Sequence, residues 1–181
     1  ITLVSSDSVA SILTTRNLMQ PFSKVQTDSL NPPFFEKAGV SFEFIPVPHR
    51  DDVSDTHAIL ISGKKSRVLF LPDHDDWDET LGLVGYSNPR DWFGSMNLTH
   101  VLLDATFWNG EELPGRDITK VPHPTVEDTL SRLQESANEG PEIILIHLNH
   151  TNPLNNSNSA QSKAIEAAGL TVGKRAWSIE L

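Results

Sequence analysis

Cysteine is absent from this chain of 181 residues. Its absence excludes disulfide frameworks, cysteine-based zinc ribbons and thiol nucleophiles. The chain also has no Gly-x-Ser-x-Gly segment, which argues against a serine hydrolase of the nucleophile-elbow type, and no glycine-rich phosphate loop. Three common kinds of catalytic or nucleotide-binding site are therefore excluded.

Basic charge is scarce as well. The 14 Lys and Arg residues face 24 Asp and Glu residues, and the net charge is −10. The densest basic run, Lys64 and Lys65 with Arg67, is more typical of a polar turn between strands than of a surface that neutralises phosphates. No apolar run is long enough to span a bilayer, and no signal-peptide pattern opens the chain. We expect a soluble, cytoplasmic protein that binds neither nucleic acid nor membrane, with a homo-oligomer left open.

The hydrophobic pattern predicts an α/β protein with a mixed sheet, because strands run as a meander early and alternate with helices later. Strands are expected over residues 1–5, 42–47, 57–62, 67–71, 100–105, 143–146, 170–172 and 176–179. Helices are expected over residues 8–17, over two short stretches within 73–97, from Thr125 to about 137, and over 159–168. Residues 20–37, with at most one short helix, and 110–124 are expected to be loops.

Short polar clusters follow three of the predicted strands directly. His49 comes after strand 42–47, Asp73 after strand 67–71, and His147 after strand 143–146. A rigid sheet can hold ligands that lie far apart in the sequence, and imidazole nitrogen with carboxylate oxygen suits Zn, Fe or Mn. The pattern predicts a metal site at one edge of the sheet, with Asp51, Asp52 and Asp55 as candidate acceptors that orient the imidazoles.

Each candidate also has a purely structural interpretation. His49 could be a solvated loop residue, Asp73 could belong to an acidic loop that caps the next helix, and His147 could be a core histidine with both nitrogens satisfied. The acidic run after Pro72 lacks the glycine and the closing glutamate of a calcium loop.

Two further residues need a partner or a role. Asp104 closes a strand that is apolar throughout, so its charge must be compensated if it is buried. His123 lies between two prolines at the head of a predicted helix, where a capping residue is more common than a metal ligand. The sequence pattern alone leaves both roles open.

Six motifs occur together, in a fixed order, over roughly residues 40–181. They are Pro46 to Thr56 with His49 and Asp55, Leu69 to Asp73 followed by Trp77, Leu102 to Phe107, Pro114 to Asp117, Pro122-His123-Pro124, and Ile146 to Pro153. In this combination the chain resembles the metallo-β-lactamase-fold hydrolases, and within them the branch around coenzyme PQQ synthesis protein B.

The resemblance implies an αββα sandwich with metals at one edge of two facing sheets. It gives His49 as a ligand of the first metal, Asp73 as the aspartate that bridges both metals, and His147 as a ligand of the second. His123 matches a histidine near the leaving group in the related tRNase Z enzymes, and Asp104 their acidic-Ala-Thr-Phe segment, so Asp73 and His123 are the implied catalytic residues. The implied cofactor is a divalent metal, Zn with Fe or Mn as alternatives and up to two ions, and the implied reaction is attack by metal-bound hydroxide on a small molecule.

The chain departs from the family at one point. The first metal motif, His-x-His-x-Asp-His, does not occur in the sequence. We therefore expect residues 1–181 to form a partial domain, the second half of the sandwich, with an apolar face where the first half would pack. The alternative is a non-catalytic binding or accessory protein that keeps the fold without that motif.

Overall fold

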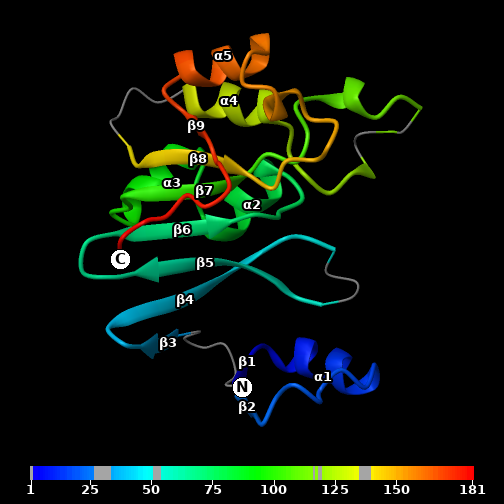
Figure 1. Cartoon of the computed structure of the whole chain (residues 1–181), viewed down its shortest axis with the longest axis vertical. Helices are drawn as coiled ribbons and strands as arrows, with labels where there is room; N and C mark the ends of the chain where they lie inside the picture. Colours follow the sequence, from blue (N-terminus) through cyan, green and yellow to red (C-terminus); the bar gives the residue numbers. More distant parts are fainter. Residues whose placement is uncertain (1, 27–33, 51–53, 116, 118–119, 135–139) are drawn as a thin grey trace.

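The computed structural model describes residues 2–26, 34–50, 54–115, 117, 120–134 and 140–181. Within these residues a mixed sheet of seven strands runs in the order β3-β4-β5-β6-β7-β8-β9 (Figure 1). Its strands are β3 (Phe34–Lys37), β4 (Val40–Val47), β5 (Thr56–Ser62), β6 (Arg67–Leu71), β7 (His100–Asp104), β8 (Glu142–Ile146) and β9 (Thr171–Val172).

The strand pairing changes from antiparallel to parallel at β6. Strands β3 to β6 pair antiparallel, and the tight turn between β5 and β6 is closed by a hydrogen bond of 2.9 Å from Gly63 N to Ser66 O. From β6 to β9 every pair is parallel, and each new strand joins the outer edge in chain order. Parallel neighbours need long connections, and here these connections hold the helices.

All of the helices after β6 pack on one face of the sheet. They are α2 (Trp77–Val84), α3 (Pro89–Ser95), α4 (Val126–Gln134) and α5 (Ala160–Ala167). Right-handed crossovers between strands that are added in one direction place their helices on the same side. The main core accordingly combines Leu69, Val101 and Ile143 of the sheet with Trp77 of α2 and Leu133 of α4. Each of these five side chains is buried.

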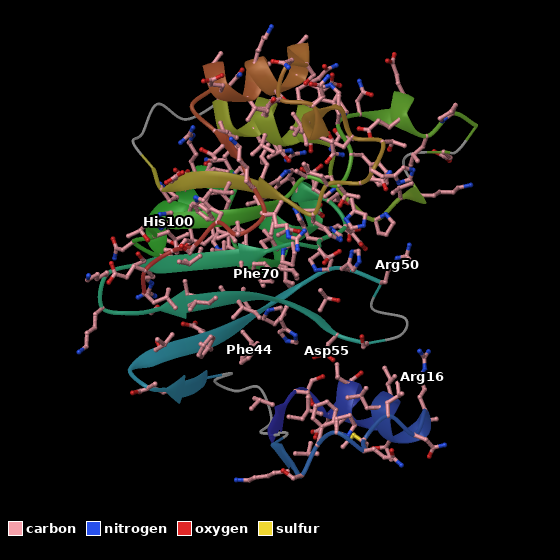
Figure 2. The ribbon with its side chains drawn as sticks, in the orientation of Figure 1. Arg16, Phe44, Arg50, Asp55, Phe70 and His100 are labelled. Atoms are coloured by element: carbon pink, nitrogen blue, oxygen red, sulfur yellow. The ribbon has the colours of Figure 1, made fainter. Side chains whose placement is uncertain are left out.

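The opposite face is only partly covered. Phe44, Ile59 and Phe70 lie side by side on it by register, and all three are half-buried. Figure 2 labels Phe44 and Phe70. The last residues of the chain cross another part of this face, where the ring of Trp177 meets His100 edge-on at 6.2 Å between centroids. An apolar strip on β4, β5 and β6 is therefore left partly open.

A small unit precedes the main sheet. Its parallel strands β1 (Thr2–Val4) and β2 (Lys24–Gln26) flank helix α1 (Asp7–Thr15). Ser6 caps α1, accepting a hydrogen bond of 3.2 Å from Val9 N, and donates one of 2.6 Å to Asp55 Oδ1. This hydrogen bond ties the unit to the segment that precedes β5.

Most predicted elements are confirmed, but two predictions are wrong. Residues 20–37 hold strands β2 and β3 rather than only loop, because tertiary pairing recruits segments too short for a clear periodicity. Residues 176–179 form no strand; Trp177 N instead bonds Lys174 O in a turn that leads the tail across the sheet face. The predicted end of the helix that starts at Thr125, at about residue 137, lies outside the described residues. No helix in the described part of the chain is long and apolar enough to cross a bilayer.

Candidate metal centre

The candidate residues lie together at the carboxyl ends of β4, β6, β7 and β8, because these four strands run in the same direction. Asp104 ends β7, His147 directly follows β8, and Asp73 follows β6 by two residues. Strand β4 is antiparallel to β5, which is antiparallel to β6, so β4 also runs toward this edge and delivers His49 there. A backbone hydrogen bond of 2.7 Å from Asp75 N to Pro48 O joins the loops after β4 and β6.

Asp73 lies between two of the predicted ligands. Its Oδ1 atom is 3.8 Å from His49 Nε2 and 3.5 Å from His147 Nδ1. The Asp73 side chain is 31% exposed, so the group is open to solvent from one side. Asp73 is thus close to both histidines, but only His49 shares a set of mutually close donor atoms with it, whereas His147 falls in a different set. The metal role of all three residues stays a prediction.

His123 also lies in this cluster. It sits just before α4, and its ring centroid is 5.1 Å from that of His49 and 5.5 Å from that of His147. Its Nδ1 atom is 2.7 Å from Asp104 Oδ2. The family resemblance implies a place for His123 near a leaving group, and in the structure its ring lies between those of His49 and His147.

Two sets of potential metal donors overlap at His123. One is His49, Asp73 and His123, the other is Asp104, His123 and His147, and within each set the donor atoms lie within 4.8 Å of one another. Two imidazoles with one carboxylate form a donor set that Zn²⁺ accepts, with the remaining positions left to water or substrate. The chemistry of the residues present therefore fits a divalent cation.

Asp104 differs from Asp73 in its surroundings. It is 1% exposed, and its Oδ1 atom accepts hydrogen bonds of 2.9 Å from Thr106 N and 2.6 Å from Thr106 Oγ1. Burial by itself raises the pKa of the Asp104 carboxyl, but hydrogen bonds from the neighbouring imidazoles and from Thr106, led by the His123 bond, outweigh it and bring the pKa to about 2. Asp104 is therefore an ionised, buried carboxylate beside His123 and His147.

The backbone at His147 is locally unusual. His147 has a φ of 61°, in the left-handed region that few residues other than glycine adopt. Hydrogen bonds on both sides hold it there, from Ala105 N to Ile146 O and from Asn149 N to Thr106 O, each 3.0 Å. The Asp104 carboxylate raises the pKa of the His147 imidazole above its usual value.

The amides next to His147 have structural roles. Asn152 donates to Ala105 O at 2.8 Å and accepts at 2.9 Å from Leu154 N, where it caps the short 3-10 helix η3 (Pro153–Asn155). His150 is exposed and bonds Asn149 Oδ1 at 3.1 Å. The polar side chains of this segment therefore stabilise, through these hydrogen bonds, the turn that follows His147.

The carboxylate beside His49 was not singled out from the sequence. Asp75 Oδ1 lies 3.2 Å from His49 Nδ1, whereas Asp55 pairs with His57 at 3.5 Å. Asp51 and Asp52 lie outside the described residues. Asp75 stands in a run of acidic residues whose members look alike in sequence, so only the folded loop distinguishes it.

His74, next to Asp73, belongs to the core rather than to either donor set. It is fully buried, its Nδ1 atom is 2.9 Å from Thr80 Oγ1, and its ring meets Trp77 edge-on at 4.6 Å. Burial lowers the pKa of His74 to about 4, so the imidazole is neutral at ordinary pH.

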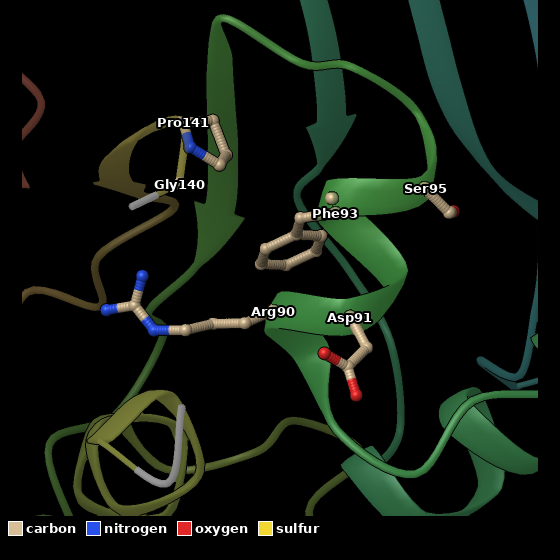
Figure 3. Close-up of a pocket in the computed structure, with 7 residues that line it drawn as sticks. Arg90, Asp91, Phe93, Ser95, Gly140 and Pro141 are labelled. Carbon is tan, nitrogen blue, oxygen red and sulfur yellow. The ribbon is translucent and has the colours of Figure 1, made fainter. Parts of the chain in front are cut away.

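A cavity of about 560 Å³ opens beside His123. Its walls are mainly polar and come from the loop after β6, the start of α2, the segment before α4 and α4 itself; they include Asp75, Asp76, Lys120 and Asp128. A second cavity, of about 470 Å³, is lined by Arg90, Phe93, Gly140 and Pro141 (Figure 3). Because Gly140 and Pro141 precede β8, this second cavity lies at the opposite edge of the sheet from the imidazole cluster.

Comparison with known proteins gives the family likeness. No family model matches the chain. Coenzyme PQQ synthesis protein B of Acinetobacter baumannii (strain ACICU) is 33% identical over 163 residues, covering 78% of this chain and 50% of the relative, and the protein of strain SDF is 32% identical over the same coverage. The Zn²⁺-bound PqqB from Methylobacterium extorquens superposes with a TM-score of 0.78 at 19% identity, over 100% of this chain and 62% of that one.

The chain has the metallo-β-lactamase fold and is similar to coenzyme PQQ synthesis protein B. The metallo-β-lactamase fold protein YhfI from Bacillus subtilis matches with a TM-score of 0.60 at 15% identity, over 95% of this chain and 61% of that one. A diphosphatase from the PhnP family matches with a TM-score of 0.58 at 14% identity, over 96% and 55%. The chain spans about half the length of the curated relatives it matches. The fold class and the family likeness predicted from the motifs are thereby confirmed.

Proposed function

We propose that this chain is a hydrolase-type domain that uses a divalent metal and acts on a small molecule. The observation that carries the proposal is the convergence of His49 and His147 on Asp73, with atoms 3.8 and 3.5 Å from the same carboxylate oxygen. These residues follow three separate strands. If they were unrelated, solvated loop residues, we would not expect their side chains to meet at one carboxylate.

His49 and Asp73 would hold the cation together with His123, which shares their donor set, or with His147, which the family resemblance implies and whose Nδ1 atom is 3.5 Å from Asp73 Oδ1. A divalent cation bound there supplies a Lewis acid that polarises the substrate and makes water more acidic. The Zn²⁺-bound PqqB from Methylobacterium extorquens and the PhnP-family diphosphatase, which share the fold, support a divalent metal and hydrolytic chemistry respectively.

The remaining residues of the cluster would handle protons. Ionised Asp104 accepts a hydrogen bond from His123 Nδ1, which leaves Nε2 of His123 as the ring atom that can exchange a proton with a bound molecule. The cavity beside His123 offers a place for a small substrate. Its acidic lining and the net charge of −10 disfavour a nucleic acid in that position.

A second candidate function is a binding or accessory role without catalysis. It is favoured by one observation, that the sequence contains no His-x-His-x-Asp-His segment. The two candidates differ in turnover rather than in metal binding. The test is hydrolysis of bis(4-nitrophenyl) phosphate, a general phosphodiester probe, in the presence of Zn²⁺. Even slow hydrolysis that is lost in Asp73→Asn would favour the hydrolase, and none above the buffer rate would favour the binding role.

Calorimetric titration with Zn²⁺ tests the metal site. We expect binding by the wild-type chain that Asp73→Asn abolishes, since an amide of the same shape removes the anionic donor. Asp7→Asn, which changes an exposed aspartate at the start of α1, is the matched control and should bind as the wild type does. Equal binding by Asp73→Asn and the wild type would overturn the site.

A further inference from the structure

The turn that follows β8 begins at His147 and is held at two points. At its base, Asn149 N donates a hydrogen bond of 3.0 Å to Thr106 O, two residues after β7. At its tip, the hydroxyl of Thr151 accepts a hydrogen bond of 2.6 Å from Asn149 Nδ2 and donates one of 2.9 Å to Glu112 Oε2. The base contact joins two backbone groups, whereas the tip contacts are made by side chains. A substitution can therefore release the tip of the turn while its base stays in place.

The other oxygen of Glu112 leads to the support of His123. Glu112 is half-buried, and its Oε1 atom accepts a hydrogen bond from Trp108 N. Trp108 is bonded to the first turn of α4, because its Nε1 atom donates to Glu127 Oε1 at 2.9 Å and its carbonyl oxygen accepts from Glu127 N at 3.2 Å. The segment that carries His123 leads directly into this helix. The two oxygens of Glu112 therefore join the turn beside His147 to the part of the fold that carries His123.

His147 depends on such support because of its backbone and its exposure. A residue with a side chain keeps a φ of 61° only where the surrounding contacts determine it, and the side chain of His147 is 45% exposed. Its ring centroid is 5.5 Å from that of His123, and its Nδ1 atom is 3.5 Å from Asp73 Oδ1. A small movement of the turn would change both distances.

We propose that Glu112 is a positioning residue, which joins the turn after β8 to the loop after β7 and thereby fixes the imidazole of His147 relative to that of His123. The inference rests on the proposed function, in the form in which His147 binds the cation, for its purpose. It rests on the contacts of Glu112 and Thr151 for its geometry. Glu112 belongs to neither donor set, so its effect reaches a cation only through His147. Residues that orient a metal ligand commonly change metal affinity roughly 10- to 100-fold when they are removed.

The first test is NMR spectroscopy of the metal-free chain. In the wild type we expect a nuclear Overhauser effect between the ring protons of His123 and His147, and a strong one between HN and Hα of His147, which is typical of a positive φ. Glu112→Ala removes both contacts and should weaken both effects. The effect between His49 and His123, whose ring centroids are 5.1 Å apart, should stay, because the turn after β8 carries neither ring.

Two further variants separate position from general stability. Glu112→Gln keeps an oxygen that can accept from Trp108 N and offers an amide N–H to Thr151 Oγ1, so it should restore the wild-type pattern. Glu111→Ala removes an exposed carboxylate at the neighbouring position and is the matched control, which should change neither effect. A folded Glu112→Ala that loses stability without any change at His147 would overturn the proposal and leave Glu112 a structural residue.

Thr151→Val tests the tip contact alone, because it removes the hydroxyl of an exposed side chain and keeps its shape. It should reproduce the changes at His147 even if Glu112→Ala cannot be purified. The double variant should show no further change at His147, since both substitutions break the same link. An unchanged His147 in folded Thr151→Val, or equal changes in Glu111→Ala, would overturn the proposal.

Calorimetric titration with Zn²⁺ gives a second measurement. We expect Glu112→Ala and Thr151→Val to lower the affinity roughly 10-fold or more, and Glu112→Gln and Glu111→Ala to leave it unchanged. An affinity equal to that of the wild type in both of the first two variants would overturn the role of Glu112 in holding a metal ligand. If the wild-type chain binds no Zn²⁺, the proposed function fails, while the metal-free spectra still decide whether Glu112 positions His147.

Discussion

The Nδ1 atom of His123 lies 2.7 Å from Oδ2 of Asp104, a carboxylate that is 1% exposed. Strand β7 delivers the aspartate and the segment before α4 delivers the histidine, so the pair joins two parts of the fold at the cluster. A buried charge is stable only when it is compensated, and here the imidazole and Thr106 compensate it. The stability of this part of the fold and the geometry of its imidazoles are therefore coupled.

Replacing Asp104 with Asn should lower the free energy of unfolding by roughly 3 kcal/mol, because the change breaks a buried, hydrogen-bonded charge pair. It should also lower the pKa of His147, since the carboxylate that raises that pKa is gone. Urea denaturation and an NMR pH titration measure the two effects. Asp55→Asn, at a half-exposed carboxylate paired with His57, is the control and should lower the free energy of unfolding by clearly less than Asp104→Asn does. Equal losses in the two variants would contradict the special role of Asp104.

The wild-type chain should lose stability as the pH falls from 6.5 toward 4. The folded-state pKa of His74 is about 4 against 6.5 in the unfolded chain, so the unfolded state binds more protons in this window. The stabilisation from neutral His74 is complete above its unfolded-state pKa of 6.5, and it is lost as the pH falls toward its folded-state pKa of about 4. The loss approaches roughly 3 kcal/mol, because a pKa change of one is worth about 1.4 kcal/mol.

The matched variant for this pH effect is His74→Leu, which fills the same buried position without a titrating group. Its stability, measured by chemical denaturation at a series of pH values, should show a flatter slope between pH 6.5 and 4 than the wild type. A slope equal to that of the wild type would show that another group causes the acid sensitivity. The contribution of Asp104 falls at lower pH, because its folded pKa is about 2.

This chain alone should bind Zn²⁺ weakly and show little turnover. Among the described residues, the candidate donors are the accessible carboxylate of Asp73 and the imidazoles of His49, His123 and His147. A neighbouring carboxylate such as that of Asp75, 3.2 Å from His49 Nδ1, cannot replace a missing imidazole ligand. Calorimetric titration measures the affinity and the stoichiometry. A tight isotherm with two ions per chain would show that further residues complete the site.

The partly open sheet face should bind a dye that reports exposed apolar surface. Phe44, Ile59 and Phe70 are half-buried neighbours there, and such strips favour association between molecules. Phe70→Thr keeps a strand-forming residue and should reduce both dye binding and any dimer seen by sizing chromatography. Leu83→Gln, at a 60% exposed position on α2, is the control and should change neither. A wild type that is a dye-silent, cooperatively melting monomer would contradict the prediction of an open face.

Local sequence patterns were sufficient for most elements. The near-continuous apolar run at β7 predicts a strand, and Ser159 before an amphipathic stretch predicts the start of α5; both are observed. Burial of β7 on both faces was also predicted, but His100 and Leu102 on one face are only half-buried. The motifs also named His49, Asp73 and His147, because each follows a strand directly. Strands β2 and β3 were missed, since segments of three and four residues carry too little pattern and form only through pairing.

The sequence by itself determined the strand ends, the absence of cysteine ligands and nucleophiles, and the identity of the residues that meet at one edge of the sheet. Only the tertiary structure decided their pairing: Asp75 rather than Asp55 beside His49, His123 among the imidazoles, and Thr106 between Asp104 and His147. The physical reason is that strand direction follows from local pattern and short connections, whereas hydrogen-bond partners depend on how loops distant in sequence pack. Acidic side chains in one run look alike until the fold brings one of them within reach of an imidazole.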